Sequence, residues 1–252
     1  MMKLLLLLLV TSCATVKPKL NKVRSNNGQI FSYRDVSGEF EIAREIKVNK
    51  QKIATRTRIF SPNNEGERLL EKTFAISNVG SVKTSGGRAI AIRPELSQHT
   101  VWLEGKQYFS QLKLIPSRKV LEVIMQSPEE KWQGKKEYKV PKGQIFCFYS
   151  QLPECLVASG LLEKAKKRGS RARFILIWDS FPYHQEHFSG LKASPFSTAS
   201  LGQESATSYL IEFNGQSISI HFSKDAIFAR LLWTSQGISI LPPAEMQDTQ
   251  DM

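Results

Sequence analysis

The stretch Gly38–Phe60, GEFEIAREIKVNKQKIATRTRIF, decides the fold class. Apolar and polar residues alternate through both halves, which is typical of β-strands with one buried face. The Asn49-Lys50 pair between the halves suits a two-residue turn. The register that follows from this turn makes these cross-strand pairs: Phe40 with Ile59, Ile46 with Ile53, and Glu41 with Arg58. The apolar pairs share one face and the charged pair the other, so the stretch predicts a β-hairpin.

Arg44 interrupts the inner face of this hairpin. A charged side chain on an otherwise apolar face needs water or a partner. Arg44 therefore marks either the rim of the sheet or a polar pocket inside it.

The rest of the chain repeats the hairpin pattern. Asn214-Gly215 is the strongest turn signal because both residues accept positive φ. The remaining expected strands are Leu69–Val79 and Arg88–Ile92 around a turn at Gly80–Gly87, Thr100–Leu103 and Lys106–Ile115 around Glu104-Gly105, Val120–Met125, Ile145–Tyr149, Phe174–Asp179, and a C-terminal meander from Tyr209 to Trp233. About ten to twelve strands joined by hairpins predict a mainly β fold, a curved antiparallel sheet forming a half-barrel or open barrel.

One short α-helix is expected near 152–168. Pro153 suits its first turn, and Gly169 suits the position just past its end. An apolar stripe of Leu156, Val157, Leu161, Leu162 and Ala165 predicts that one face packs against the sheet.

The N-terminus carries an export signal. Met1-Met2-Lys3 supplies a positive start, Leu4–Val10 is unbroken apolar sequence, and Val10-Thr11-Ser12-Cys13 ends in small residues and a cysteine. This order defines a secretory signal peptide, and seven apolar residues are too few to cross a bilayer.

Val10-Thr11-Ser12-Cys13 resembles the lipobox of bacterial lipoproteins. The resemblance implies removal of the signal peptide at residues 1–12 and a lipid on Cys13. Ala14, where aspartate would retain a lipoprotein in the inner membrane, implies the periplasmic leaflet of the outer membrane. The alternative is an ordinary signal peptide with an incidental Cys13.

Four regions follow along the chain. They are the signal peptide at 1–12, a lipidated N-terminus and flexible tether at 13–27, a single β-rich domain at 28–241, and a disordered tail at 242–252. The formal net charge of +12 would suit nucleic acid, but export excludes that partner. The membrane, through the Cys13 lipid, and an envelope lipid or protein are the expected partners.

Once Cys13 carries lipid, Cys147 and Cys155 remain. An even number of cysteines in an oxidising compartment predicts a disulfide, with two buried thiols as the alternative.

The strongest polar cluster is His184-Gln185-Glu186-His187 with Asp179 upstream. His184, His187 and Asp179 are candidate metal ligands if the segment is helical. No helix is expected there, so a surface loop with incidental histidines is the preferred interpretation. No cofactor is expected.

Ser180–Glu204 lacks periodicity, yet it carries aromatic residues among Ser, Gly and Pro. A long segment of this kind inside a domain suggests a functional loop. The candidate ligand-binding residues are Phe181, Tyr183, Phe188 and Phe196. The hypothesis is a lid, hinged at Gly190 and Gly202, over an apolar pocket lined by residues such as Leu121, Val123, Phe213 and Ile220.

A lipid-anchored curved sheet with one helix is similar in architecture to the lipoprotein localisation factors. The preferred hypothesis is a non-enzymatic envelope protein that binds an apolar ligand or a protein partner in the concavity of its sheet. The alternatives are a metal-dependent or other hydrolase using the 179–187 cluster, and a structural or assembly subunit of an envelope complex.

Overall fold

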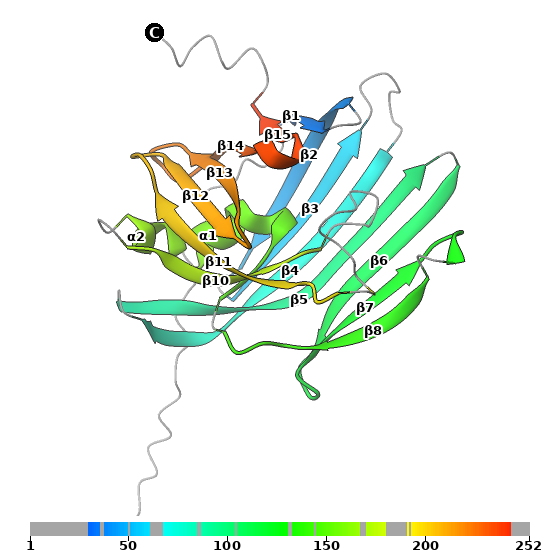
Figure 1. Cartoon of the computed structure of the whole chain (residues 1–252), viewed down its shortest axis with the longest axis horizontal. Helices are drawn as coiled ribbons and strands as arrows, with labels where there is room; N and C mark the ends of the chain where they lie inside the picture. Colours follow the sequence, from blue (N-terminus) through cyan, green and yellow to red (C-terminus); the bar gives the residue numbers. More distant parts are fainter. Residues whose placement is uncertain are drawn as a thin grey trace, which may run out of the picture.

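The computed structural model describes residues 30–35, 38–49, 51–60, 68–84, 87–103, 105–130, 133–143, 145–166, 170–179, 191 and 193–242. The expected signal peptide, Cys13, the tether and residues 243–252 lie outside these ranges. The described chain is mainly β, as the alternation of the sequence predicts (Figure 1). None of its helices has the length and apolar character needed to span a bilayer.

Fifteen strands form one sheet in the described part of the chain. Those before the helices are β1 (Ile30–Asp35), β2 (Gly38–Val48), β3 (Lys52–Phe60), β4 (Arg68–Thr84), β5 (Gly87–Leu103), β6 (Lys106–Ile115), β7 (Val120–Gln126), β8 (Gly134–Lys139) and β9 (Phe146–Phe148). Those after the helices are β10 (Ala172–Ile177), β11 (Phe196–Gln203), β12 (Ser208–Phe213), β13 (Gln216–Phe222), β14 (Phe228–Trp233) and β15 (Ile238–Leu241).

The strand order is β8-β7-β6-β5-β4-β3-β2-β1-β15-β14-β13-β12-β11-β10-β9. The β1–β15 pair joins the two halves of the chain, and neither strand was expected from the sequence. All neighbours are antiparallel except β9 and β10, which run parallel on either side of the helices. The sequence interpretation, which expected hairpins and no βαβ unit, was wrong at this one crossover.

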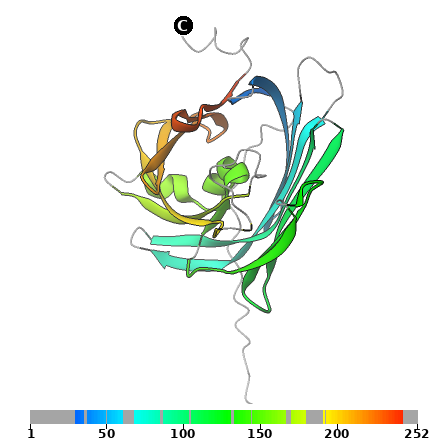
Figure 2. The same ribbon diagram turned by 45° about the vertical axis from the view of Figure 1, so that its right-hand side comes forward.

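The sheet curls without closing into a barrel. Ile145, just before β9, forms an isolated parallel bridge to Ile92 of β5, so one edge of the sheet returns to its middle. Figure 2 shows the helices inside the resulting curl. The concave face therefore meets a helical plug.

The plug is two helices where the sequence predicted one. α1 (Leu152–Ala158) and α2 (Leu161–Ala165) are separated at Ser159-Gly160, and Gly160 adopts a left-handed φ of 76°. A glycine with positive φ ends a helix because it tolerates this backbone conformation best. Every residue of α1 is buried, so the helix is part of the core.

The 38–60 hairpin forms, but its expected register was wrong by two residues. Ile42 pairs with Ile59 and Val48 with Ile53. The Asn49 side chain accepts hydrogen bonds from the backbone N–H groups of Gln51 and Lys52, at 2.9 and 2.7 Å. This Asx turn lengthens the loop by two residues. A shift of two keeps the inner and outer faces unchanged.

β4 and β5 extend through the predicted glycine-rich turn. Gly80 pairs with Ala91, and only residues 85–86 separate the two strands. Pro94 lies in β5 beyond the end of β6, whose pairing stops at Leu96. The β4–β5 register shifts beside Pro94, between Ala75 and Ile76, and such an irregularity is one of the places where a strand accepts a proline.

The Cys147–Cys155 disulfide predicted from the sequence is present, with Cα atoms 5.7 Å apart. It joins β9 to α1, and both cysteines are buried. The bond ties the plug to the strand that precedes it.

Candidate functional site

Of the seven residues predicted as ligand-binding or metal-ligating, only Asp179 and Phe196 lie in the described chain. Phe196 begins β11, which shows that the expected irregular segment 180–204 ends in a strand. Its half-buried ring packs against Phe146, with centroids 6.4 Å apart. Phe181, Tyr183, His184, His187 and Phe188 lie outside the described residues.

A row of polar residues crosses the concave face. The strand registers align these residues across β2 to β6, through the backbone of β4: Arg44 of β2, Thr57 of β3, His99 of β5 and Ser110 of β6. Arg44, Thr57, His99 and Ser110 are buried. Uncompensated polar groups at such positions are destabilising. Among the described residues, Thr57 Oγ1 and Ser110 Oγ have no hydrogen-bond partner, whereas Arg44 and His99 face carboxylates.

Two carboxylates from the other side of the curl meet this row. Both oxygens of Glu154, in α1, accept hydrogen bonds from Arg44 Nη2 at 2.8 Å. The side chains of Arg44 and Glu154 are each 4 % exposed. Asp179 follows β10, and its Oδ2 lies 3.8 Å from His99 Nε2. The Arg44 that interrupted the sequence pattern thus marks a buried ion pair.

The turn before α1, the 3₁₀ helix η2 (Tyr149–Gln151), connects these contacts. The Ser150 N–H donates to Asp179 Oδ1 at 3.2 Å, and the Ser150 carbonyl accepts from Arg44 at 3.3 Å. Gln151 Nε2 donates to Thr55 Oγ1 at 2.7 Å. Arg44 of β2, Thr55 of β3 and Asp179, which follows β10, therefore all form hydrogen bonds with this one turn.

This geometry does not suit nucleophilic catalysis. A serine nucleophile needs a histidine base that is oriented by an acid. Here Ser97 Oγ donates directly to Asp179 at 3.3 Å, and Ser97, His99 and Asp179 are all 0 % exposed. Among the described residues, no three His, Cys, Asp or Glu side chains converge as a metal site. The cluster can hold the plug in place.

The four residues expected to line an apolar pocket belong to the core. Leu121, Val123 and Ile220 are 0 % exposed and Phe213 is 4 % exposed. Phe213 lies in an aromatic group with Tyr149, Trp178 and Trp233, whose ring centroids are 5.1 to 5.7 Å apart. Trp178 Nε1 also donates to Ser197 Oγ at 2.8 Å. Packing and hydrogen bonds fill this part of the interior.

Burial, with a smaller contribution from the Asp179 charge, raises the pKa of Tyr149 well above its ordinary 10.0. The unfolded chain ionises this phenol near pH 10, whereas the folded chain keeps it neutral. Stability from Tyr149 is therefore complete below pH 10 and falls above it, by up to about 1.4 kcal/mol per pH unit.

We expect Tyr149→Phe to reduce the loss of stability between pH 9.5 and 11, because phenylalanine cannot ionise. Urea unfolding of both proteins at each pH measures the difference. Equal losses in the two proteins would show that Tyr149 titrates normally.

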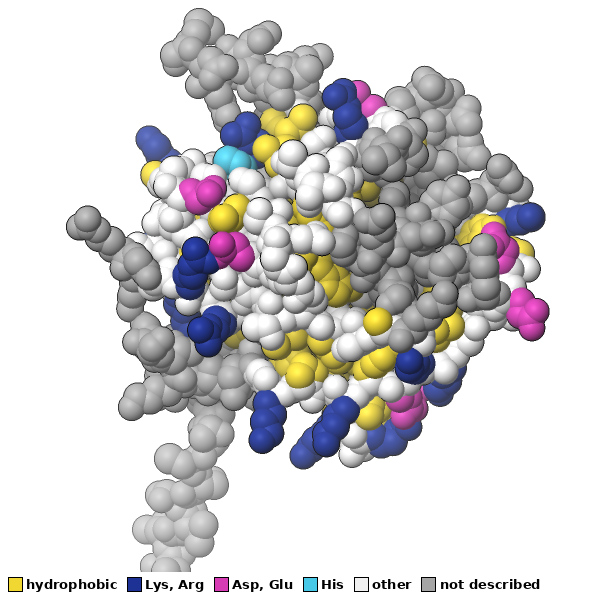
Figure 3. All heavy atoms as spheres, viewed as in Figure 1, with side chains coloured by type: hydrophobic (Ala, Val, Ile, Leu, Met, Phe, Trp, Pro, Cys, Tyr) yellow, Lys and Arg dark blue, Asp and Glu magenta, His cyan; other side chains and the backbone are white. Residues whose placement is uncertain are grey.

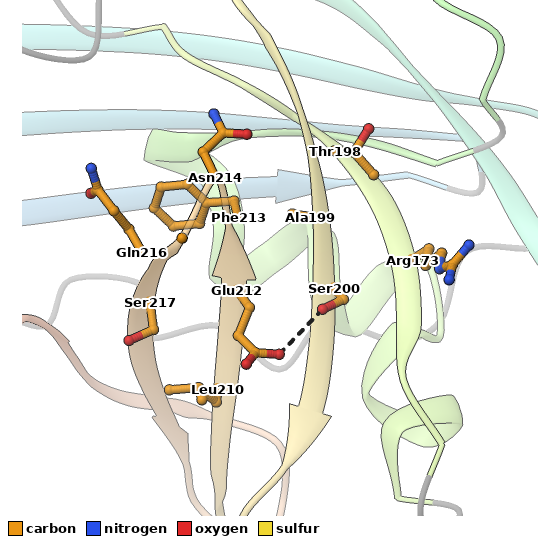
Figure 4. Close-up of a pocket in the computed structure, with 11 residues that line it drawn as sticks. Arg173, Thr198, Ala199, Ser200, Leu210, Glu212, Phe213, Asn214, Gln216 and Ser217 are labelled. Atoms are coloured by element: carbon orange, nitrogen blue, oxygen red, sulfur yellow. Dashed lines mark hydrogen bonds between the residues drawn. The ribbon is translucent and has the colours of Figure 1, made fainter.

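A shallow hollow lies on the outer face of β10 to β13 and encloses about 640 Å³. The strand registers align four polar residues across its floor: Arg173, Ser200, Glu212 and Ser217. Figure 4 shows Ser200 pointing toward Glu212 across the two strands, and the Ser200 Oγ to Glu212 Oε2 distance is 3.5 Å. We call this surface the outer hollow.

Charge in the outer hollow is partly compensated. Glu212 also pairs with Arg171, which is exposed just before β10. Asn214 and Gln216, in and beside the β12–β13 turn, add amide groups to its lining. Leu210 adds an apolar side chain. Ala199 and Phe213 also line the hollow. The surface therefore presents hydrogen-bond donors and acceptors together with apolar atoms, which suits a partly polar binding partner.

The outer hollow was not predicted from the sequence. Its signal was the alternation in Tyr209–Phe222, where the residues between the buried ones are polar. Recognising the row needed the β10–β11 and β11–β12 registers, and β11 was hidden in the segment interpreted as a loop.

Comparison of the chain with protein-family models, with curated proteins and with solved structures finds no match.

Proposed function

We propose that this chain is a lipid-anchored, non-enzymatic envelope protein that binds a protein partner at the outer hollow. Anchoring rests on the similarity of Val10–Cys13 to a lipobox. By the same resemblance, Ala14 supports the periplasmic leaflet of the outer membrane, or the outer face of the membrane in a single-membrane organism.

One observation carries the choice of a protein partner over an apolar ligand. The described concave face is occupied by α1, the aromatic group and the contacts of Arg44 and Asp179, while the polar row of the outer hollow faces outward. An apolar ligand needs an apolar cavity, whereas protein interfaces carry about one hydrogen bond per 100–200 Å².

The hydrolase alternative depends on the 179–187 cluster. Asp179 is its only described metal-ligand candidate, and both of its oxygens are engaged by Ser97 and Ser150. This arrangement supports a structural role for Asp179. The assembly-subunit alternative is compatible with a protein partner, and identification of that partner separates the two.

We expect Cys13→Ala to release the protein from membranes, because stable anchoring at this site needs the acyl chains on the cysteine. Fractionation of cells expressing the variant measures this. A variant that still sediments with the outer membrane would rule out the lipid as the anchor.

A photo-cross-linking residue at Ser217 tests the partner site in intact cells. Ser217 is exposed in the outer hollow. Arg56, exposed on β3 of the other half of the sheet, is the matched control position. We expect discrete protein adducts from Ser217 that are absent from Arg56. Adducts with lipid alone, or the same adducts from both positions, would contradict the proposal.

A further inference from the structure

The two ends of the sheet differ. Ile145, beside the end strand β9, bridges to β5, whereas β8 pairs with β7 on one side and with no described strand on the other. Five of its six residues are exposed, and the sixth, Tyr138, is half-buried. β8 is therefore the free edge of the sheet in the described chain.

The alternation of backbone hydrogen bonds along β8 shows which of its N–H and C=O groups face away from β7. The N–H of Val140 donates to the carbonyl of Lys119 at 3.0 Å, so Val140 faces β7. Backbone direction alternates along a strand, so Tyr138, Lys136 and Gly134 also face β7. The N–H and C=O groups of Lys135, Glu137 and Lys139 therefore point away from the sheet. A row of such groups is a template for an added strand.

The charge of this edge is strongly biased. β8 holds three lysines against one glutamate, and Arg118 and Lys119 lie in the adjacent turn. Glu137 is bound by Arg118 at 2.6 and 2.8 Å, and Glu122 of β7 is bound by Lys135 at 2.5 Å. Lys119 and Lys139 form no ion pair with a described residue. Figure 3 shows basic side chains at the lower right, where Figure 1 places β6 to β8.

We propose that the β8 edge binds an extended acidic polypeptide segment by strand addition. Outward N–H and C=O groups of Lys135, Glu137 and Lys139 would pair with the backbone of the segment, as in other edge-strand complexes. Its carboxylates would lie opposite or beside Lys135 and Lys139 on the outer face, where opposite charges stabilise cross-strand pairs. This site lies at the other end of the sheet from the outer hollow and does not depend on it.

A second copy of the chain fits less well. Two β8 strands paired antiparallel in the register centred on Glu137, which brings their outward-facing groups together, place Glu137 opposite Glu137 and each Lys135 opposite Lys139. Like charges opposite one another are destabilising. Edge lysines discourage self-association for this reason, and the same charges select an acidic segment.

The probe is a short synthetic peptide of alternating threonine and glutamate, titrated by fluorescence anisotropy against the full chain carrying Cys13→Ala. A threonine–lysine peptide tests charge. A threonine–glutamate peptide with alternate N-methylated amides tests backbone pairing. We expect saturable binding of the first peptide alone. No saturable binding of that peptide, or equal binding of the N-methylated form, would overturn the proposal.

Two pairs of protein variants locate the site. Glu137→Pro removes one outward N–H, which an edge strand tolerates, and Glu137→Thr removes the same carboxylate but keeps the N–H. We expect Glu137→Pro to bind about tenfold more weakly than Glu137→Thr. We expect Lys139→Glu to weaken binding roughly three- to thirtyfold. Lys106→Glu, on the exposed β5–β6 turn, is the charge-matched control and should bind normally.

Far-UV circular dichroism and melting temperature establish that each variant is folded. Equal binding by Glu137→Pro and Glu137→Thr would overturn strand addition. Equal weakening by Lys139→Glu and Lys106→Glu would show non-specific attraction and overturn the site. Dimerisation of the chain that Glu137→Pro abolishes would identify a second copy as the occupant and overturn the acidic-partner assignment.

Discussion

We expect Arg44→Met to lower the free energy of unfolding by about 3–5 kcal/mol, because the substitution leaves the Glu154 carboxylate buried without its cation. Both side chains are 4 % exposed, and Arg44 also donates to the Ser150 carbonyl. The loss should appear in urea unfolding of the Cys13→Ala protein.

The double variant Arg44→Met with Glu154→Leu should regain most of this loss, since it removes both charges and keeps apolar volume. Arg34→Met is the matched control, because its ion pair with Glu39 is 62 % and 53 % exposed and should not affect stability measurably. If Arg44→Met were no more destabilising than Arg34→Met, the buried pair would not hold the plug.

We expect loss of the Cys147–Cys155 disulfide to lower the free energy of unfolding by roughly 2–3 kcal/mol. The bond closes a loop of sequence separation 8, and restricting that loop in the unfolded chain stabilises the folded one. The double variant Cys147→Ala, Cys155→Ala measures this in urea.

Reductant provides an internal check on the same bond. Dithiothreitol should destabilise the parent protein and leave the double variant unchanged. If reductant shifted both unfolding curves equally, the effect would not come from this disulfide.

Local patterns predicted the fold class and many of its strands. Alternation in Gly38–Phe60 and Tyr209–Phe222 indicates that one face of each hairpin is buried. The buried face is predicted correctly even when the predicted turn is wrong. The two-residue register error arose because the Asn49 side chain caps a longer loop. The sequence leaves that choice open, since asparagine suits both turns.

Long-range partners were the part that local patterns could not supply. Arg44 was recognisable as an anomaly, but its partner Glu154 lies 110 residues away and on the helix. Asp179 was noticed as a candidate metal ligand, but its contacts with Ser97 and Ser150 depend on how the sheet curls. Strands β1 and β15 were not predicted, and their pairing with each other, which joins the two halves of the chain, is not reported by any local pattern.

For the two candidate surfaces, too, the local residue pattern was visible in the sequence, whereas the long-range strand pairing was not. The basic character of β8 is visible in Gly134–Lys139, but its position as the free edge follows only from the strand order. The outer hollow required the strand β11 to be recognised before its polar row could be assembled.

The claim that the described part of the concave face is a packed core and not a ligand cavity is tested most directly by mass spectrometry. The full chain with Cys13→Ala, purified without detergent, is measured first in its native state and then after denaturation. We predict a native mass equal to that of the polypeptide and no stoichiometric small molecule on denaturation. Release of one lipid or other apolar molecule per chain would contradict the claim and return the function to an apolar ligand held inside the sheet.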